Sequence, residues 1–228
     1  MMKILLFILL SLNAFASIGN IMALKGSAEI HRGANNILTA KSGMKIEEGD
    51  KIITQSKTRA QVILSDDTII TIGANSSFQF DKFFFDGSKK STLSMRMNRG
   101  FFRSVTGKIG KIAPERFKVK TSSATIGIRG TDFSVRLQNA IERFRCYSGG
   151  IRITFGNTIR DINAGESFEL NLKNLREWAE QAGIEFKDRS SLKAVDLPDL
   201  KDIEEADREI VYPRPEPIIP DGVPCQIK

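Results

Sequence analysis

The sequence predicts an all-β fold: a single antiparallel β-rich domain over residues 17–172, built as a twisted sandwich or in a solenoid-like way. Two observations predict it. Short runs with alternating apolar and polar residues fill this region, and clusters of Gly, Asp or Asn, which are typical of turns, separate the runs. Beyond this domain we expect one or two short helices within residues 173–211, and a proline-rich, extended tail over residues 212–228.

The clearest pair of strands is a hairpin over residues 60–73, in which β-branched residues dominate both arms. Asp66 and Asp67 at its tip could serve acid–base chemistry or bind a metal, but a hairpin tip favours plain turn residues. A second hairpin is expected around Asp86-Gly87, because Asp-Gly between apolar runs is a strong hairpin signal.

A third hairpin is expected between residues 141–147 and 151–155, around Ser148-Gly149-Gly150. Residues 26–50 and 150–166 also share a loose pattern of glycines, which indicates a structural repeat without establishing a solenoid.

The N-terminus has the three parts of a secretory signal peptide over residues 1–16. A short positive end with Lys3 is followed by an apolar run and by an Ala-x-Ala sequence ending at Ala16. The run is shorter than the roughly 20 residues that span a bilayer. We therefore expect cleavage before Ser17 and a periplasmic or secreted protein, with no transmembrane segment after cleavage.

The charge is unevenly distributed along the chain. Between residues 96 and 160 there are 14 Lys or Arg and three acids, whereas residues 161–228 hold 16 acids and nine bases. Such asymmetry often indicates a partner. Three readings stay open: the acidic part lies against the basic part, the basic face meets an anionic envelope component, or the two surfaces are unrelated and solvated. Export disfavours nucleic acid as the partner.

Two cysteines, Cys146 and Cys225, follow the leader. An oxidising compartment permits a disulfide between them, which would close a long loop and stabilise the fold by roughly 4 kcal/mol. Two free thiols or an intermolecular link are the alternatives.

The run Phe83, Phe84 and Phe85 cannot point entirely inward, because side chains alternate on a strand. At least one ring is expected to be exposed or covered by another element, which makes the run a candidate contact patch. His31 is the single histidine, and nothing near it in the sequence supports a catalytic triad. No cysteine and histidine spacing predicts a zinc site. We therefore expect no catalytic residue, metal or cofactor, so the domain is predicted to be non-enzymatic.

The most specific segment runs from Lys118 to Val135. Its features are a strand ending at Thr121, a stretch of small residues, and the block Gly127-Ile128-Arg129-Gly130-Thr131 leading to Phe133. This arrangement resembles the FecR-domain family, and weaker features extend the resemblance over residues 18–172. The resemblance implies a periplasmic, all-β module for sensing or signalling. The best-known members sit in the inner membrane and relay a signal to a sigma factor, a plan that this sequence does not match.

The signature residues are expected to be mainly structural. Gly127 and Gly130 permit tight or left-handed backbone beside Arg129. The guanidinium of Arg129 offers five donors and is expected to clamp loop carbonyls or a carboxylate inside the domain, rather than to bind a ligand. Thr131 is expected to cap or hydrogen-bond the turn.

The predicted function is that of an exported, non-enzymatic binding module in envelope sensing or signalling, whose partner is an envelope protein or glycan. One alternative is a structural scaffold or assembly component of the envelope. The other, less favoured, is an envelope enzyme that uses carboxylates.

Overall fold

The computed structural model describes residues 17–156 and 158–172, and this part of the chain is built almost entirely of β-strands. The predicted all-β class is confirmed for these residues. The expected leader (1–16), the helical extension from residue 173 onward and the proline-rich tail (212–228) lie outside the described residues. No helix of the described part is long and apolar enough to cross a membrane.

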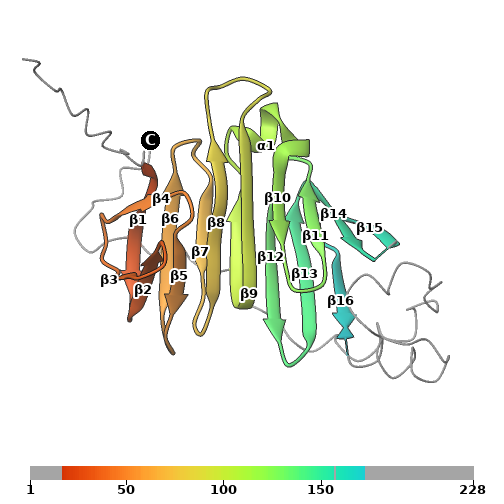
Figure 1. Ribbon diagram of the computed structural model, residues 1–228. Coiled ribbons are helices and arrows are strands. Elements are labelled where there is room, and N and C mark those ends of the chain that lie inside the picture. Colours follow the sequence, from red (N-terminus) through yellow and green to blue (C-terminus); the bar gives the residue numbers. More distant parts are fainter. Residues whose placement is uncertain (1–16, 157, 173–228) are drawn as a thin grey trace, which may run out of the picture.

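The strands form two hydrogen-bonded sheets that share one long strand, β9 (Figure 1). Sheet A has the order β4 (Lys45–Glu47), β1 (Ser17–Lys25), β6 (Arg59–Leu64), β7 (Ile69–Ile72), β9 (Thr92–Val105), β12 (Asp132–Gln138), β13 (Ile141–Ser148) and β16 (Ser167–Asn171). Sheet B has the order β3 (Asn36–Thr39), β2 (Ala28–Arg32), β5 (Lys51–Thr54), β8 (Ser77–Phe84), β9, β10 (Phe117–Lys120), β11 (Thr125–Ile128), β14 (Gly150–Phe155) and β15 (Thr158–Asn163).

The two sheets face each other across one hydrophobic core. The ring of Phe78 on β8 in sheet B lies 5.2 Å, centroid to centroid, from that of Phe102 on β9. Farther along the molecule, the ring of Phe155 on β14 in sheet B stacks on that of Phe168 on β16 in sheet A, at 5.7 Å. The strands alternate between buried and exposed residues because one face of each sheet lines this core. The described part therefore agrees with the sandwich alternative.

β9 supplies the covalent link at the middle of the sandwich. Its first half pairs with β8 and β10 in sheet B, and its second half, from Gly100 onward, pairs with β7 and β12 in sheet A. The pair β9–β10 is parallel, unlike the antiparallel pairs predicted. The reason is the connection from 106 to 116, which returns the chain to the starting end of β9 through a short helix α1 (Ile109–Ile112) and a 3-10 turn η1 (Pro114–Arg116). Neither short helix was expected from the sequence.

Two of the predicted hairpins are confirmed, and one is wrong. β6 pairs with β7 around Asp66 and Asp67, and β8 pairs with β9 beyond Asp86-Gly87. β13 and β14 do not pair with each other: β13 lies in sheet A beside β12 and β16, and β14 lies in sheet B beside β11 and β15. The chain crosses between the layers at Gly149. The sequence Ser148-Gly149-Gly150 suits such a crossover as well as a hairpin turn within one sheet, so it does not distinguish the two.

The weak glycine repeat corresponds to a repeated path of the chain. At one end, β1 in sheet A leads to the hairpin β2–β3 in sheet B and back to β4, which pairs with β1. At the other end, β13 in sheet A leads to the hairpin β14–β15 in sheet B and back to β16, which pairs with β13. The sandwich therefore begins and ends with the same four-strand arrangement.

Candidate interaction surfaces

The segment with the most specific sequence pattern is the place where the chain passes from sheet B to sheet A. β10 and β11 form a hairpin in sheet B, joined by residues 121–124. After β11 the chain turns through residues 129–131 and continues as β12, which pairs with β9 and β13 in sheet A. The small residues of this segment therefore serve a turn and a crossover between layers.

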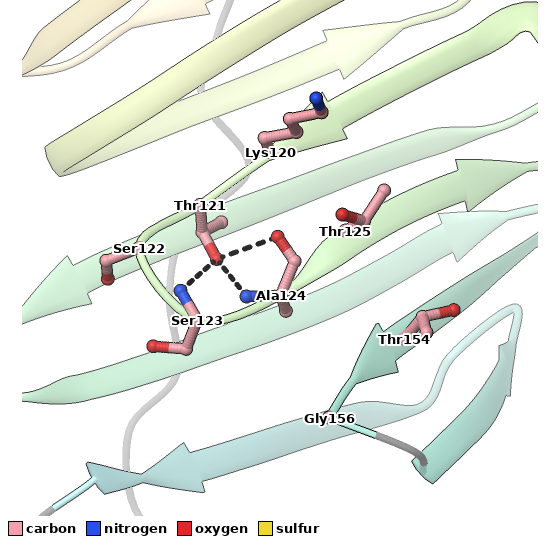
Figure 2. Close-up of a pocket in the computed structure, with 8 residues that line it drawn as sticks. All are labelled: Lys120, Thr121, Ser122, Ser123, Ala124, Thr125, Thr154 and Gly156. Carbon is pink, nitrogen blue, oxygen red and sulfur yellow. Dashed lines mark hydrogen bonds between the residues drawn. The ribbon is translucent and has the colours of Figure 1, made fainter. Parts of the chain in front are cut away.

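The hydroxyl groups of the turn 121–124 converge on one buried carboxylate. The hydroxyl of Thr121 donates to Glu142 Oε2 at 2.6 Å, and the hydroxyls of Ser122 and Ser123 donate to Oε1. Glu142 lies on β13 in the opposite sheet and is 1% exposed. The same Thr121 oxygen accepts hydrogen bonds from the backbone of Ser123 and Ala124, which Figure 2 shows as dashed lines. This cluster ties the turn of one layer to a strand of the other.

The turn also borders an open, polar hollow of about 330 Å³. Figure 2 shows its lining, which consists of Lys120, Thr121, Ser122, Ser123, Ala124, Thr125, Thr154 and Gly156. Lys120 is the ionisable member of this set, and the three hydroxyls at positions 121–123 already donate to Glu142. The arrangement suits a structural role for the hollow better than nucleophilic or acid–base catalysis.

Replacing Glu142 by Gln is expected to lower the free energy of unfolding by about 2 kcal/mol. Three hydroxyl donors would lose a charged acceptor, and hydrogen bonds to charged groups are worth about 1.5–3 kcal/mol. Urea unfolding followed by circular dichroism measures the change. Glu115→Gln, at an exposed residue of η1, is the matched control and should behave as the wild type. Equal stability of the two variants would contradict this role of Glu142.

The block Arg129-Gly130-Thr131 differs from expectation at its charged residue. Arg129 is exposed, and the side-chain hydrogen bond recorded for it is a long one of 3.4 Å to Asn163 Oδ1. The guanidinium lies over the backbone of Gly150, which has no side chain to obstruct it. The prediction of a clamp inside the domain is therefore wrong: Arg129 lies on the surface, at the crossover between the layers.

The neighbours of Arg129 match the prediction in part. Gly130 has φ +60°, the left-handed backbone expected there, whereas Gly127 lies within β11 in ordinary extended backbone, with room for a side chain. Thr131 fixes the crossover through its backbone, because its N–H donates to Thr106 Oγ1 and its carbonyl accepts from Thr106 N. Its own hydroxyl is buried and has no partner among the described residues. Phe133 is fully buried in the core, 5.6 Å from the ring of Phe102.

The run of three phenylalanines is divided between core and solvent. Phe83 and Phe85 pack against the core, and Phe84, which points to the opposite side, is 47% exposed. The ammonium of Lys108 lies 6.0 Å from the ring centroid of Phe85. The run therefore presents one exposed ring, and a contact role for it stays a prediction.

A larger surface of interface type lies on the outer side of sheet A, over β9, β12 and β13, which lie side by side in Figure 1. We call it the arginine face, and it consists of Phe101, Arg103, Arg136, Arg143, Arg145 and Tyr147. The register aligns Arg103 with Ser134 and Arg145, and Phe101 with Arg136 and Arg143, so all these side chains leave the sheet on the side opposite the core.

The arginines of this face stack on its aromatic rings. The guanidinium carbons of Arg103 and Arg145 lie 4.5 and 5.4 Å from the ring centroid of Tyr147, and that of Arg136 lies 4.9 Å from Phe101. Two carboxylates share the surface: Asp132 pairs with Arg103, and Glu169 pairs with Arg143 at 2.6 Å. Among the described residues, four arginines share this face with two acids, so it carries ordered planar donors and an excess of positive charge, and Arg145 on it is exposed.

Sequence reasoning recognised the basic stretch but not this face. The available signal was the alternation of arginine with apolar residues at positions 143–146, which places the arginines on one side of a strand. The three strands that build the face are brought together by pairing over up to 37 residues of sequence, between Gly100 and Leu137, which the pattern does not specify.

Cys146 lies in the core between the sheets, and its thiol donates to the carbonyl of Ser148. Burial raises the pKa of this thiol above its ordinary value, which lowers the fraction present as reactive thiolate. Cys225 lies outside the described residues, so the bridge between the two stays a prediction. His31 on β2 contacts Glu29 at 3.2 Å, and no three metal-binding side chains gather within the described residues.

The native chain is expected to leave Cys146 unmodified by a maleimide at pH 8, because the thiol is both inaccessible and protonated. Mass spectrometry of the peptide containing Cys146, with and without denaturant, measures the protection. Labelling of Cys146 at the same rate in both conditions would show that the thiol is accessible in the folded protein.

Comparison with known proteins supports the family resemblance. The family model described as FecR protein matches residues 50–152, from the start of β5 into β14, and the predicted resemblance is confirmed. Two solved structures, both described as "a putative anti-sigma factor from Parabacteroides distasonis ATCC 8503", are 18% and 17% identical to this chain. They cover 54% of it, with TM-scores of 0.45 and 0.44. The match spans about half of each solved chain, 55% and 56%. No curated protein matches this chain.

Proposed function

Because the family model described as FecR protein matches residues 50–152, we propose that the chain is an exported, non-enzymatic regulatory protein that binds another component of the cell envelope. The regulatory effect of this chain would pass through the bound partner, in sensing or signalling at the envelope.

The arginine face carries the binding part of this proposal. Arginine and tyrosine are enriched in protein interfaces, where they combine a large contact area with directed hydrogen bonds. Here they stand together on paired strands, and the stacking of Arg103 and Arg145 on Tyr147 fixes the guanidinium planes before any partner arrives. Such ordering lowers the entropic cost of binding. An envelope protein with an acidic, partly aromatic surface would fit the face.

Export is proposed from the leader-like pattern of residues 1–16. Among the described residues, Ser17 already belongs to β1 and its hydroxyl donates to Gly19 O at 2.8 Å, and Ile18 is buried in the core. Cleavage after Ala16 would leave both residues in place.

Charge reversal at Arg145 tests the binding proposal. A tagged full-length chain with its own leader is expressed in its host, and its neighbours are crosslinked in intact cells and identified by mass spectrometry. Arg145→Glu should abolish capture of the specific partner. Lys118→Glu reverses an exposed charge on the outer side of sheet B and should leave capture unchanged.

The outcomes are distinct. Loss of the partner with both variants would place the interface elsewhere, and an identical set of neighbours for wild type and Arg145→Glu would refute the role of the face. Export is tested separately by N-terminal sequencing of the processed chain, which should begin at Ser17. A chain that keeps residues 1–16 and stays in the cytoplasm would refute the localisation.

A further inference from the structure

The outer side of sheet A combines charge with an adjoining apolar row. In register order, Ile63 on β6, Ile69 on β7 and Val105 on β9 stand next to one another, beside the row that contains Arg103 and Arg145. Val105 is 41% exposed. An occupant of this surface would need acidic groups and an apolar side.

The chain itself contains a segment of this chemistry at residues 199–210. Six acids and two bases give it a net charge of −4; the acids are Asp199, Asp202, Glu204, Glu205, Asp207 and Glu209. Its apolar residues Leu200, Ile203 and Ile210 recur at spacings of three and seven, which places them on one side of a helix. On a helix Asp199 and Asp207 would lie among these apolar residues, so one side of the segment would offer apolar contacts and acidic groups together.

The end of the described domain brings this segment within reach. β16 ends at Asn171, beside β13, which carries Arg143 and Arg145. From β16 to β9 there are three steps between strands, a distance of about 14 Å at the usual strand spacing. Residues 173–198 connect the sheet to the segment, and 26 residues at random-coil dimensions would have an end-to-end distance of roughly 30 Å. The connection is long enough to cross the face and short enough to keep the segment close.

We propose that residues 199–210 dock on the arginine face of the same chain and compete there with the envelope partner. This inference rests on the proposed function, since it names what regulates the same surface. A tether of this length gives an effective concentration of about 1 mM, so an intrinsic dissociation constant of about 0.1 mM suffices to keep the face mostly occupied. The contact is autoinhibitory: the partner gains access when it displaces the segment.

The test uses full-length mature protein and a labelled synthetic peptide of residues 199–210 as the probe. In one variant, Glu204→Gln, Glu205→Gln and Asp207→Asn remove three charges from the segment of the chain. Its matched control, Glu177→Gln with Glu180→Gln and Glu185→Gln, removes three charges from the connecting stretch. Fluorescence anisotropy should show that the first variant binds the probe about tenfold more tightly than wild type or control. Adding Arg145→Glu and Arg136→Glu should abolish this binding.

Each alternative result overturns the inference. Equal affinity of wild type and the first variant would show that the segment does not occupy the face. Binding that survives Arg145→Glu with Arg136→Glu would place the probe elsewhere. If charge removal splits a dimer in sedimentation velocity, the segment reaches a second copy instead. Partner capture in the crosslinking experiment is a separate readout, so either proposal can fail while the other stands.

Discussion

The Phe102→Ala variant is expected to lose about 4 kcal/mol of unfolding free energy, within the range of about 3–5 kcal/mol for buried phenylalanines. Phe102 is fully buried on β9, the strand that both sheets share. Its ring packs against Phe78 of sheet B and Phe133 of sheet A, at 5.2 and 5.6 Å between centroids. Truncation would leave a cavity at the joint between the layers, where neither sheet can move without breaking pairs with β9. Equilibrium unfolding in urea measures the loss.

Phe84→Ala is the matched control for this variant. It removes the same ring from the exposed end of β8, where Phe84 is 47% exposed, and should cost less than about 1 kcal/mol. Because Phe84 belongs to the candidate contact patch, the same variant in the crosslinking experiment shows whether the ring contacts a partner. Similar losses for Phe84→Ala and Phe102→Ala would mean that the core is not centred on β9.

Local sequence patterns identified the strands well because a strand that lines a core must alternate. The hairpin of β6 and β7 is specified almost completely by its β-branched arms and its Asp66-Asp67 tip. Pairing between strands that are not joined by a hairpin could not be predicted in this way, because β9 pairs with β12 and β10 through contacts that no local pattern encodes. The wrong pairing of β13 with β14 has the same cause: Ser148-Gly149-Gly150 reads as a turn, whether the next strand stays in the sheet or changes layers.

The crossover at Gly149 depends on a contact that the sequence pattern does not contain. Gly149 has φ +74°, and a Cβ there would lie 2.1 Å from the carbonyl oxygen of Gly130. Gly149 is needed because two crossovers, one after β11 and one after β13, pass each other closely, whereas a Cβ at Gly130 would meet open space and that residue is set apart by its φ of +60°. Each glycine alone reads as a turn residue, and the close approach at Gly149 appears only once both crossover segments are in place.

For the candidate site too, the sequence located the segment but not its long-range contacts. The pattern from Thr121 to Phe133 located the crossover and identified the family, but the partner of Thr121 is Glu142, which lies 21 residues away and in the other layer. Arg129 was expected inside because its five donors could clamp loop carbonyls or a carboxylate at the turn. The structure instead engages those backbone groups with Thr106 and Gly150, which leaves the side chain outside.

The Asp66→Ala variant is expected to lose about 3 kcal/mol, because one fully buried carboxylate organises two segments of the chain. Its Oδ1 accepts from Thr68 N at 3.1 Å, and its Oδ2 accepts from the Thr68 hydroxyl at 2.8 Å and from Ile109 N at 3.2 Å. Thr68 Oγ1 in turn accepts from Gly107 N. Removing the carboxylate leaves buried N–H and hydroxyl donors unsatisfied, each at a cost of about 1–3 kcal/mol. Thermal and urea unfolding measure the total.

Asp67→Asn is the control that separates the loss of a buried carboxylate from the loss of a carboxylate at an exposed turn position. Asp67 is the exposed neighbour at the same tip and has φ +67°, a conformation that asparagine tolerates, so the stability of the Asp67→Asn variant should stay close to that of wild type.

The Asp66→Ala variant should also expose residues 107–112 to amide exchange, since Asp66 holds the start of α1 against the tip of β6–β7. Because α1 returns the chain to β10, this loosening should spread to the parallel pair β9–β10. A stable Asp66→Ala protein with unchanged exchange there would show that the connection is held by its apolar contacts, such as buried Ile109, and not by the carboxylate.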